Sequence, residues 1–462
     1  MLSSVSAQEA RSSAGSTRPN VLMIIADDLG TQLGCLGDPL AKTPNIDRLA
    51  EAGISFTRAY VQATGCNPSR ISLLSGQRPP STGIFENRFW PELDVFTLPE
   101  HFEQHGYETV KIGKILHHVR RARLKRQAKG SKKHDRRVWS SVLHPAGLGK
   151  ESTREPQPSK GGFSNDKPAS QAGLIKWGAK GDDFFDAFDA RVAKSAVQFL
   201  RQAHEKPFFL AVGFAKPHLP FFAPKPYMDR FSDLPIDLPD VAPDDLHDVP
   251  EIALREGKDS PEIDPDHWRE AVRAYRACVA LVDDCVGHLL AGLEEAGLRE
   301  NTIVLFLSDH GQLLGEHNLW FKGMLFEECA RVPLILSAPG AGFKGNCDRL
   351  VEYVDVYPTL AELCGLPLPG RLEGVSLVPL LQDPTKPWKR AAFSYEDRGV
   401  SMRTERWRMT RWQDGEVELY DHDNDSEEHD NLAHSSEHTD VLAELGQLLE
   451  GGWRTCLPES PK

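Results

Sequence analysis

The stretch N-V-L-M-I-I-A-D-D, residues 20–28, decides the fold class of this chain. Its apolar part, residues 20–26, is short and continuous, which is typical of a parallel strand buried on both faces of a sheet. Two aspartates follow at once. Because ligands of open α/β sheets bind at the carboxyl ends of the strands, we expect Asp27 and Asp28 to lie at the functional edge of such a sheet.

Helical and strand patterns alternate downstream of this strand. Apolar spacing and capping residues predict helices over 43–53, 69–75, 98–105, 189–204 and 268–296. Short apolar runs predict strands over 109–112, 207–213 and 302–307. The alternation indicates a mainly parallel sheet with helices on both faces. After about Gly370 the pattern changes to short strands at 392–395, 407–410 and 417–420, then a helix over 439–450. This predicts a small antiparallel sheet near the C-terminus.

The composition is that of an ordinary soluble globular protein, with 462 residues of which 40% are hydrophobic and 26% charged. A formal charge of -13 argues against a nucleic-acid partner. The apolar runs fall well short of the roughly 18–20 residues that span a bilayer, so we expect no membrane span. The eight cysteines are scattered without a C-x-x-C pair, so disulfides are not required and most thiols are expected to be buried fillers.

Three segments differ from the rest in composition. Residues 1–17 are rich in Ser, Ala and Arg, with a small-x-small V-S-A at 5–7, and predict a disordered tail or signal-peptide remnant of a periplasmic or secreted protein. Residues 120–168 form a basic insertion, either a solvated loop or a patch that attracts polyanions. Residues 216–265 are rich in Pro and Asp and predict a long irregular excursion, a kind of segment that is often functional.

Polar residues gather at the ends of the predicted strands. Besides the aspartate pair, Asp309 and His310 follow the strand pattern at 302–307, and His218 follows the one at 207–213. An Asp-Asp pair alone is more often a helix cap or a turn than a metal site. Together with Asp309 at a second strand end, the carboxylates suit a hard cation such as Ca²⁺ or Mg²⁺.

Cys66 stands just before Pro68 and a predicted helix start, where backbone donors and Arg70 would favour a thiolate. A thiolate beside a histidine base is a candidate for ordinary cysteine nucleophilic catalysis. The alternative from the residues alone is a buried filler thiol.

The run C-N-P-S-R at 66–70 resembles the C-x-P-S-R signature of type I sulfatases, in which the cysteine is oxidised to formylglycine. The resemblance extends to P-N-V-L-M-I-I-A-D-D at 19–28, T-P-N-I-D-R-L-A at 43–50, S-D-H-G-Q-L-L-G-E-H at 308–317 and L-Y-D-H-D-N-D-S-E-E-H-D-N-L-A at 419–433. Within that family, G-K-I-L-H at 113–117, A-K-P-H-L-P-F at 215–221 and His310 are most similar to the iduronate-2-sulfatase branch. Gln312 departs from the branch, which usually has an aromatic residue there.

The resemblance implies an alkaline-phosphatase-like α/β sandwich. Its large, mixed, mainly parallel sheet would lie between helices in a catalytic domain over 18–390, and residues 391–462 would form a small α+β subdomain with an antiparallel sheet and a helix.

The resemblance also implies roles for individual residues. One divalent cation, Ca²⁺ rather than Mg²⁺, would be held by Asp27, Asp28, Asp309, His310 and the modified Cys66. The hydrated formylglycine would attack sulfur, and its second hydroxyl would later expel the sulfate. The supporting residues would be Lys114 and Lys322 on the sulfate oxygens, His218 as acid for the leaving sugar, His117 as base for sulfate release, and Arg70 on the hydrate. His118, Glu316 and His317 would orient metal ligands or contact substrate.

The implied activity is hydrolysis of a sulfate ester on a carbohydrate. We expect exo-action on a 2-O-sulfated uronate or a related fragment of a sulfated polysaccharide such as a glycosaminoglycan, after a formylglycine-generating enzyme has matured Cys66. The alternatives are a phosphonate or phosphodiester hydrolase of the same superfamily, and a non-catalytic binder of sulfated glycans if Cys66 is not matured.

Overall fold

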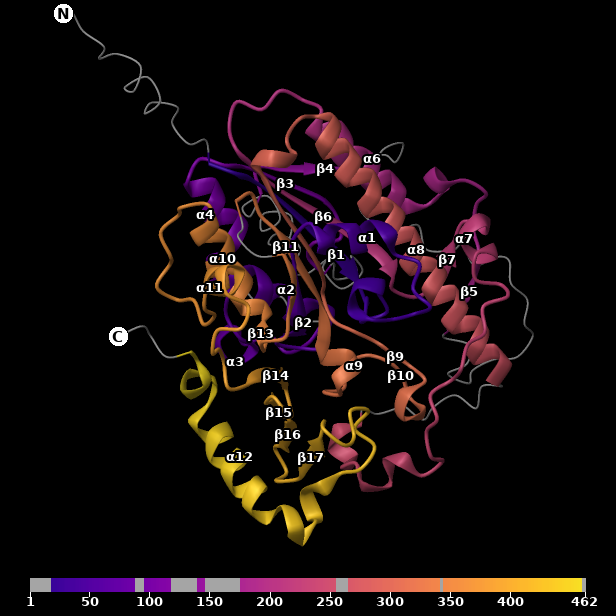
Figure 1. The fold of residues 1–462 in the computed structure, drawn as a ribbon, viewed down its shortest axis with the longest axis vertical. Helices are drawn as coiled ribbons and strands as arrows, with labels where there is room; N and C mark the ends of the chain where they lie inside the picture. The colour runs from indigo at the N-terminus through magenta and orange to yellow at the C-terminus, as the bar shows by residue number, and fades with distance from the viewer. Residues whose placement is uncertain are drawn as a thin grey trace, which may run out of the picture.

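The computed structural model describes residues 18–87, 95–117, 139–145, 175–254, 265–340 and 344–458. A large sheet lies between two groups of helices, and a smaller sheet with its own helix follows at the C-terminal end (Figure 1). This arrangement confirms the fold class expected from the sequence. The tail at 1–17 and most of the basic insertion at 120–168 lie outside the described residues.

The large sheet is mixed and mainly parallel. Within the described ranges its order is β12 (Gly345–Cys347), β2 (Ile54–Tyr60), β11 (Arg331–Ser337), β8 (Thr302–Ser308), β1 (Asn20–Asp27), β6 (Phe208–Pro217), β3 (Glu108–Gly113) and β4 (Ser141–Leu143), with β13 (Val351–Glu352) also paired to β2. Only β11 runs antiparallel to its neighbours in these ranges. Because β1, β3, β6 and β8 are parallel, their carboxyl ends meet at one edge.

Helices cover both faces of the sheet, as Figure 1 shows. One face carries α1 (Pro44–Glu51), α6 (Phe188–Leu200), α7 (Lys225–Asp229) and α8 (Pro265–Glu295). The other carries α2 (Cys66–Ser75), α4 (Leu98–Gln104), α10 (Val356–Leu363) and α11 (Val378–Gln382). Strand β1 is buried throughout: Leu22 and Ile24 pack toward α8, while Met23 packs into the opposite core. This two-sided burial explains why the strand is a continuous apolar run.

Helix α2 begins at Cys66, so the expectation that it opens after Pro68 was wrong. Gly65 precedes it in extended conformation, and the N–H of Ser69 donates to the Gly65 carbonyl (3.0 Å). Proline is tolerated in a first helical turn because the N–H it lacks would have no partner there. Cys66 therefore sits on the first turn of a helix whose residues are all buried.

Two segments expected to be irregular contribute regular structure. Ser141–Leu143, inside the basic insertion, pairs with β3 as β4, and the nearby Trp139 is 2% exposed. Within the Pro-rich excursion, β6 continues to Pro217, and β7 (Phe221–Ala223) pairs with β5 (Trp177–Ala179). From there to residue 254 the excursion alternates irregular chain with short helical turns, namely α7 and the 3-10 turns Asp245–Asp248 and Glu251–Ala253. Strands β4 and β7 form because their backbones pair with strands far away in the sequence. Their local composition does not indicate such pairing.

The C-terminal sheet is antiparallel, as expected, with the order β14 (Ala392–Glu396), β15 (Gly399–Arg403), β16 (Trp407–Trp412) and β17 (Val417–Asp421). Its apolar side packs against α12 (Thr439–Gly451). Short elements complete the described fold: α3 (Pro79–Thr82), β9 (Leu313–Leu314), β10 (Trp320–Phe321) and α9 (Glu327–Ala330). None of the described helices is both long and apolar enough to cross a membrane.

Candidate active site

The aspartates at the ends of β1 and β8 are held together by the backbone. The strands are neighbours, with Ala26 opposite Ser308, and the N–H of Asp309 donates to the Ala26 carbonyl (3.1 Å). Asp28 adopts a left-handed backbone (φ 64°), which Asp tolerates better than most residues. Its N–H then donates to Oδ1 of Asp309 (3.0 Å). These bonds hold Asp28 and Asp309 together at the carboxyl edge of the sheet, where the sequence predicts the carboxylates.

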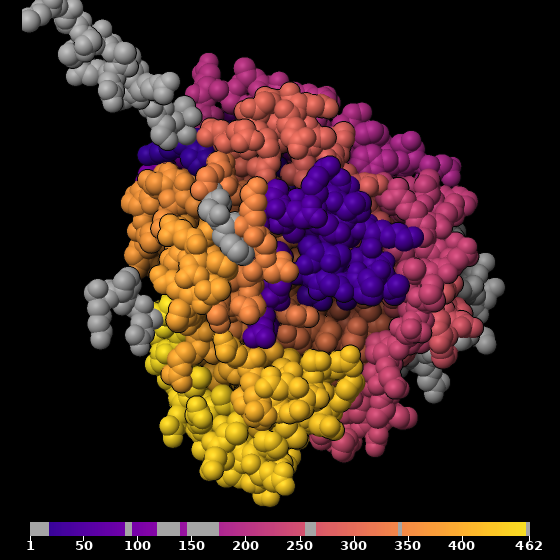
Figure 2. Space-filling view, viewed as in Figure 1, coloured from indigo at the N-terminus to yellow at the C-terminus, as the bar shows by residue number. Residues whose placement is uncertain are grey.

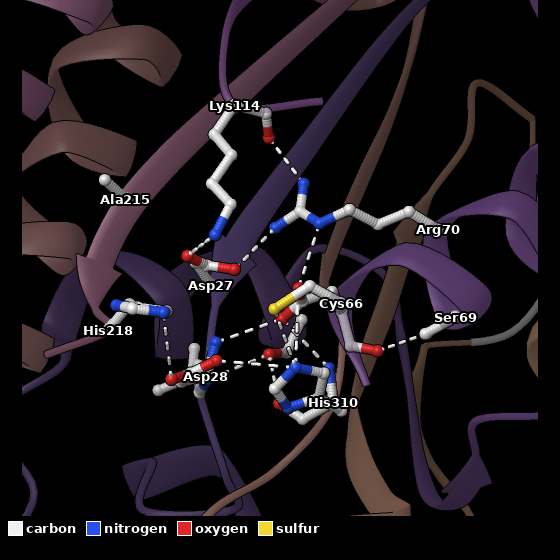
Figure 3. Close-up of polar contacts among 12 residues, drawn as sticks. Asp27, Asp28, Cys66, Ser69, Arg70, Lys114, Ala215, His218 and His310 are labelled. Atoms are coloured by element: carbon white, nitrogen blue, oxygen red, sulfur yellow. Dashed lines mark hydrogen bonds and ion pairs between the residues drawn. The ribbon is translucent and has the colours of Figure 1, made fainter. Parts of the chain in front are cut away.

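Arg70 fixes two of these carboxylates. Its Nε donates to Oδ2 of Asp309 and its Nη2 to Oδ1 of Asp27, both at 2.9 Å, while Nη1 donates to the Ile115 carbonyl (3.2 Å). The guanidinium is fully buried, so these charge-assisted bonds replace its hydration. Figure 3 shows Arg70 and Lys114 converging on Asp27 from different elements.

Cys66 faces His310 and Lys322. The Sγ atom lies 3.2 Å from Nε2 of His310 and 3.5 Å from Nζ of Lys322. Because Nδ1 of His310 donates to the Gly311 carbonyl (2.9 Å), Nε2 is the nitrogen directed at the sulfur and at Oδ1 of Asp28 (3.4 Å). Figure 3 shows the sulfur pointing into this group.

The charges around the sulfur favour a thiolate. Burial raises the pKa of the Cys66 thiol, but the ammonium groups of Lys322 and Lys114 outweigh it and lower that pKa to about 6. Burial lowers the pKa of His310, but Asp309 and Cys66 raise it to about 9. Both shifts favour the charged forms of these two side chains.

Lys114 and Lys322 bring positive charge from two further elements. Lys114 follows β3 and contacts Oδ2 of Asp27; Lys322 follows β10 and contacts Oδ1 of Asp28. Burial raises the pKa of Asp28, but Lys322 and His218 lower it below its usual value, so the carboxylate is ionised. Each of the two lysine side chains is 19% exposed, so both lie at the rim of the buried group.

His218 approaches from the end of β6. Its Nδ1 donates to the Leu219 carbonyl (2.6 Å), and its Nε2 lies 3.9 Å from Oδ2 of Asp28. The side chain is 37% exposed, so His218 lies at the solvent-facing side of the site. Asp189 of α6 accepts the backbone N–H groups of Ala215 and Lys216 at 2.8 Å each and thereby fixes the strand end before His218.

Two supporting residues were missed by the sequence analysis. Asp189 lies in a predicted helix, and the sequence around it does not indicate that its carboxylate accepts hydrogen bonds from the end of β6. Tyr275 of α8 donates its hydroxyl to the Asp28 carbonyl (2.9 Å) and accepts the Gly30 N–H (3.0 Å), so it holds the strained turn after β1. A tyrosine at a core spacing of a long helix gives no local signal for this role.

The remaining predicted residues are less closely joined to the sulfur. His117 is half-buried, its Nδ1 lacks a hydrogen-bond partner, and no hydrogen bond among the described residues joins it to Cys66. His118 lies outside the described residues. Glu316 accepts the Leu314 N–H (2.5 Å), and His317 bonds to Asp245 (2.9 Å), so both are engaged with neighbouring loops.

The donor set fits a divalent cation. One donor atom each from Asp28, Cys66, Asp309 and His310 lie within 4.8 Å of one another, and Asp27, Asp28 and His218 form an overlapping group. Carboxylate oxygens and an imidazole are ligands that divalent cations accept, and the group is buried. These residues could therefore hold a metal ion.

Comparison with known proteins gives the class of this protein. The Sulfatase family model matches residues 19–366, and the model described as N-sulphoglucosamine sulphohydrolase, C-terminal, matches residues 315–453. A sulfatase of Formosa agariphila is 30% identical over 456 residues, covering 94% of this chain and 86% of the relative. The fold, the site and these matches make the chain a sulfuric ester hydrolase. It belongs to the sulfatase family.

Two further similarities are informative. Iduronate 2-sulfatase of Mus musculus is 33% identical over 401 residues, covering 76% of this chain and 70% of the relative. Among solved structures, phosphonate monoester hydrolase of Agrobacterium radiobacter has the same fold, with a TM-score of 0.75, 23% identity, and coverage of 94% of this chain and 95% of that one.

Proposed function

We propose that this sulfatase removes a sulfate ester from a 2-O-sulfated uronate, or a related sulfated sugar, at the end of an oligosaccharide. The observation that carries the proposal is the position of Cys66 Sγ, 3.2 Å from His310 Nε2 and 3.5 Å from Lys322 Nζ, beside the buried aspartates. The likeness to iduronate 2-sulfatase supports a 2-sulfated uronate as the substrate class.

Two groups would complete the site. Asp27, Asp28, Asp309, His310 and residue 66 would hold Ca²⁺ in preference to Mg²⁺, because irregular carboxylate sets suit the larger ion. When bound, the cation supplies Lewis-acid polarisation of a sulfate oxygen and a lowered pKa for a hydroxyl at residue 66. Formylglycine at position 66, made by a maturation enzyme, supplies that hydroxyl as its hydrate.

The chain's own cations would bind and orient the sulfate group. Lys114 and Lys322 stand on separate elements with their ammonium groups near Asp27 and Asp28, where they can also reach sulfate oxygens. Their fixed positive charges would stabilise the negative charge that the sulfate oxygens carry in the transition state. Arg70, held by Asp27 and Asp309, would fix the position of residue 66 by keeping α2 against the two strands.

Proton transfers would use the two histidines. His218 Nδ1 is occupied by the Leu219 carbonyl, so Nε2 is the atom that can give a proton to the departing sugar oxygen. A sugar alkoxide leaves poorly, and a positioned acid is worth roughly 10²–10⁴ in rate. His117 would take the proton from residue 66 that accompanies release of sulfate.

The proposal extends to the division of the chain into domains and to the compartment in which the enzyme works. Residues 18–390 would act as the catalytic domain and 391–462 as a subdomain, and the enzyme would work in the periplasm or outside the cell, where sulfated polysaccharides occur.

The test is sulfate release by the Ca²⁺-loaded enzyme, with formylglycine confirmed at residue 66, from an unsaturated 2-O-sulfated uronate disaccharide and its 6-O-sulfated isomer. Both isomers carry the same charge, so attraction alone cannot produce a preference. We expect selective release from the 2-O-sulfated compound. Equal rates, or preference for the 6-O-sulfated isomer, would contradict the uronate assignment.

The alternative activity is phosphonate or phosphodiester hydrolysis, in the fold shared with the phosphonate monoester hydrolase. The two activities are distinguished by measuring kcat/KM for a sulfate monoester and a phosphonate monoester that have the same phenol leaving group. A higher kcat/KM for the phosphonate would favour that activity over the proposed one.

A further inference from the structure

A second cluster of metal-binding side chains lies outside the sulfate-ester site. Asp245 comes from a 3-10 turn (Asp245–Asp248) in the Pro-rich excursion, His317 from the turn Glu316–Asn318 between β9 and β10, and His429 from the chain after β17. These positions are far apart in sequence. Figure 2 shows the C-terminal residues in yellow lying against the pink residues of the excursion at the lower right.

The carboxylate of Asp245 lies between the two imidazoles. Its Oδ1 is 2.6 Å from Nδ1 of His429, and its Oδ2 is 2.9 Å from Nδ1 of His317. Donor atoms from all three side chains lie within 4.8 Å of one another. A tetrahedron with metal–ligand distances of about 2.0–2.2 Å has edges of about 3.3–3.6 Å, so adjustments below about 1 Å would bring these atoms around one ion.

The imidazole of His317 is held rigidly in this cluster. It is fully buried and stacks on Phe326, with ring centroids 4.0 Å apart and an interplanar angle of 19°. Its backbone is left-handed (φ 55°), a conformation that costs a non-glycine residue conformational energy. Its Nε2 has no hydrogen-bond partner among the described residues. Burial and stacking therefore hold this imidazole beside Asp245.

His429 has the outer contact that metal-bound histidines typically make. Its Nε2 lies 3.1 Å from Oε2 of Glu427, so a carboxylate can accept the second ring N–H while Nδ1 faces Asp245. The side chain is 29% exposed, so this side of the cluster is open to entry of an ion and to a water as fourth ligand.

A comparison within the chain favours a cation here. The other described carboxylate–histidine cluster, Glu327, His422 and Glu428, is neutralised by the guanidinium of Arg408, which contacts both glutamates. Within the described residues Asp245 pairs with the imidazoles of His317 and His429 and with no lysine or arginine. Two imidazole nitrogens with a carboxylate suit Zn²⁺, whereas Ca²⁺ takes six to eight oxygens.

We infer that Asp245, His317 and His429 form a second metal site, for a transition-metal dication of the Zn²⁺ type, that joins the Pro-rich excursion, the β9–β10 turn and the C-terminal subdomain. The site is separate in its ligands from the sulfate-ester site. Since Lys322 directly follows β10, the ion would also steady the segment that carries this lysine.

The test is zinc content of the full-length enzyme. Wild type, His429→Gln and Asp245→Asn are dialysed against Zn²⁺ in the presence of excess Ca²⁺, washed, and analysed for metal per chain by mass spectrometry. The matched control is His434→Gln, because His434 is an exposed histidine of the same subdomain. We expect wild type and the control to hold one more Zn²⁺ per chain than either site variant, and Zn²⁺ to raise the melting temperature of wild type and control by more than that of either site variant.

The result is the difference in Zn²⁺ per chain between two proteins. Any zinc at the sulfate-ester site is present in both and therefore cancels. Circular dichroism reports whether each variant is folded, and Asp245→Asn retains the size and part of the hydrogen bonding of the original residue if His429→Gln is not folded. Equal zinc content in wild type and the folded site variants would overturn the inference. So would wild-type enzyme that binds no zinc.

Discussion

Arg70 shows how one side chain organises the site. Its planar fork bonds to Asp27 and Asp309, which stand at the ends of two neighbouring strands, and its stem belongs to the helix that starts at Cys66. Lysine could not reproduce two directed bonds of this geometry. Arg70 therefore couples the position of residue 66 to the carboxylates.

The role of His218 leads to a prediction about leaving groups. His218→Gln removes the proton that Nε2 would give, so we expect kcat for a sugar sulfate to fall roughly 10²–10⁴-fold. A nitrophenyl sulfate, whose leaving group needs no acid, should lose less than about tenfold. Steady-state kinetics on both substrates measures the difference, and His434→Gln is the control. Equal losses on the two substrates would assign His218 a role other than proton donor.

At the scale of elements, the site depends on the close approach of β3 and β6. The N–H of Lys114 donates to the Gly213 carbonyl (2.9 Å), and a Cβ built on Gly213 would overlap the Lys114 backbone. Gly113, just before Lys114, adopts a left-handed backbone (φ 77°) to make this turn. Two glycines thus set where the Lys114 ammonium stands.

Gly213→Ala should displace Lys114. We expect a loss of about 1–3 kcal/mol in the free energy of unfolding and a fall in kcat/KM, because an added methyl must push the two backbones apart. Gly370→Ala is the matched control, since a Cβ there meets nothing within 4 Å. Chemical denaturation and kinetics measure the two effects. Wild-type values for Gly213→Ala would show that the approach does not position Lys114.

Much of the fold could be predicted from periodicity, because β1, β6 and β8 are buried on both faces and α6 and α8 carry regular apolar spacing. No strand was predicted at Arg331–Ser337, where Pro333 interrupts the apolar pattern of β11; a register shift between Val332 and Leu334 accommodates the proline. The carboxylates at parallel strand ends could likewise be placed. Contacts such as Asp189 to β6 or Asp245 to His429 could not, because loops far apart in sequence leave no periodic signal.

At the scale of the whole molecule, buried charges attach the C-terminal sheet to the large one. Glu352 of β13 bonds to Nη1 and Nη2 of Arg78 (2.6 and 2.8 Å), to Lys389 (2.6 Å) and to the backbone N–H of Phe393 in β14 (2.9 Å). Burial raises the pKa of Glu352, but Arg78 and Lys389 outweigh it and lower that pKa to about 2.

This shift predicts how stability depends on pH. Because the folded-state pKa lies below the ordinary value of 4.5, the stabilisation by Glu352 is fully present above about pH 4.5 and is lost as the pH falls toward 2. Its size is on the order of 3 kcal/mol. Glu352→Gln should be markedly less stable than wild type near neutral pH, and the gap should narrow on acidification.

Denaturant unfolding of both proteins across the acid range measures this gap, with the exposed Glu437→Gln as control. A gap that stays constant as the pH falls would show that Glu352 is not ionised in the folded protein.

Sulfate release should depend on whether residue 66 is a cysteine or a formylglycine. Enzyme is prepared with and without a formylglycine-generating enzyme, the oxidised fraction of the Cys66 peptide is determined by mass spectrometry, and sulfate release is measured on the same samples beside Cys66→Ala. We expect a rate proportional to the oxidised fraction, and no release by Cys66→Ala. Full activity in enzyme with an intact thiol would contradict it and would instead assign the chemistry to the thiolate paired with His310.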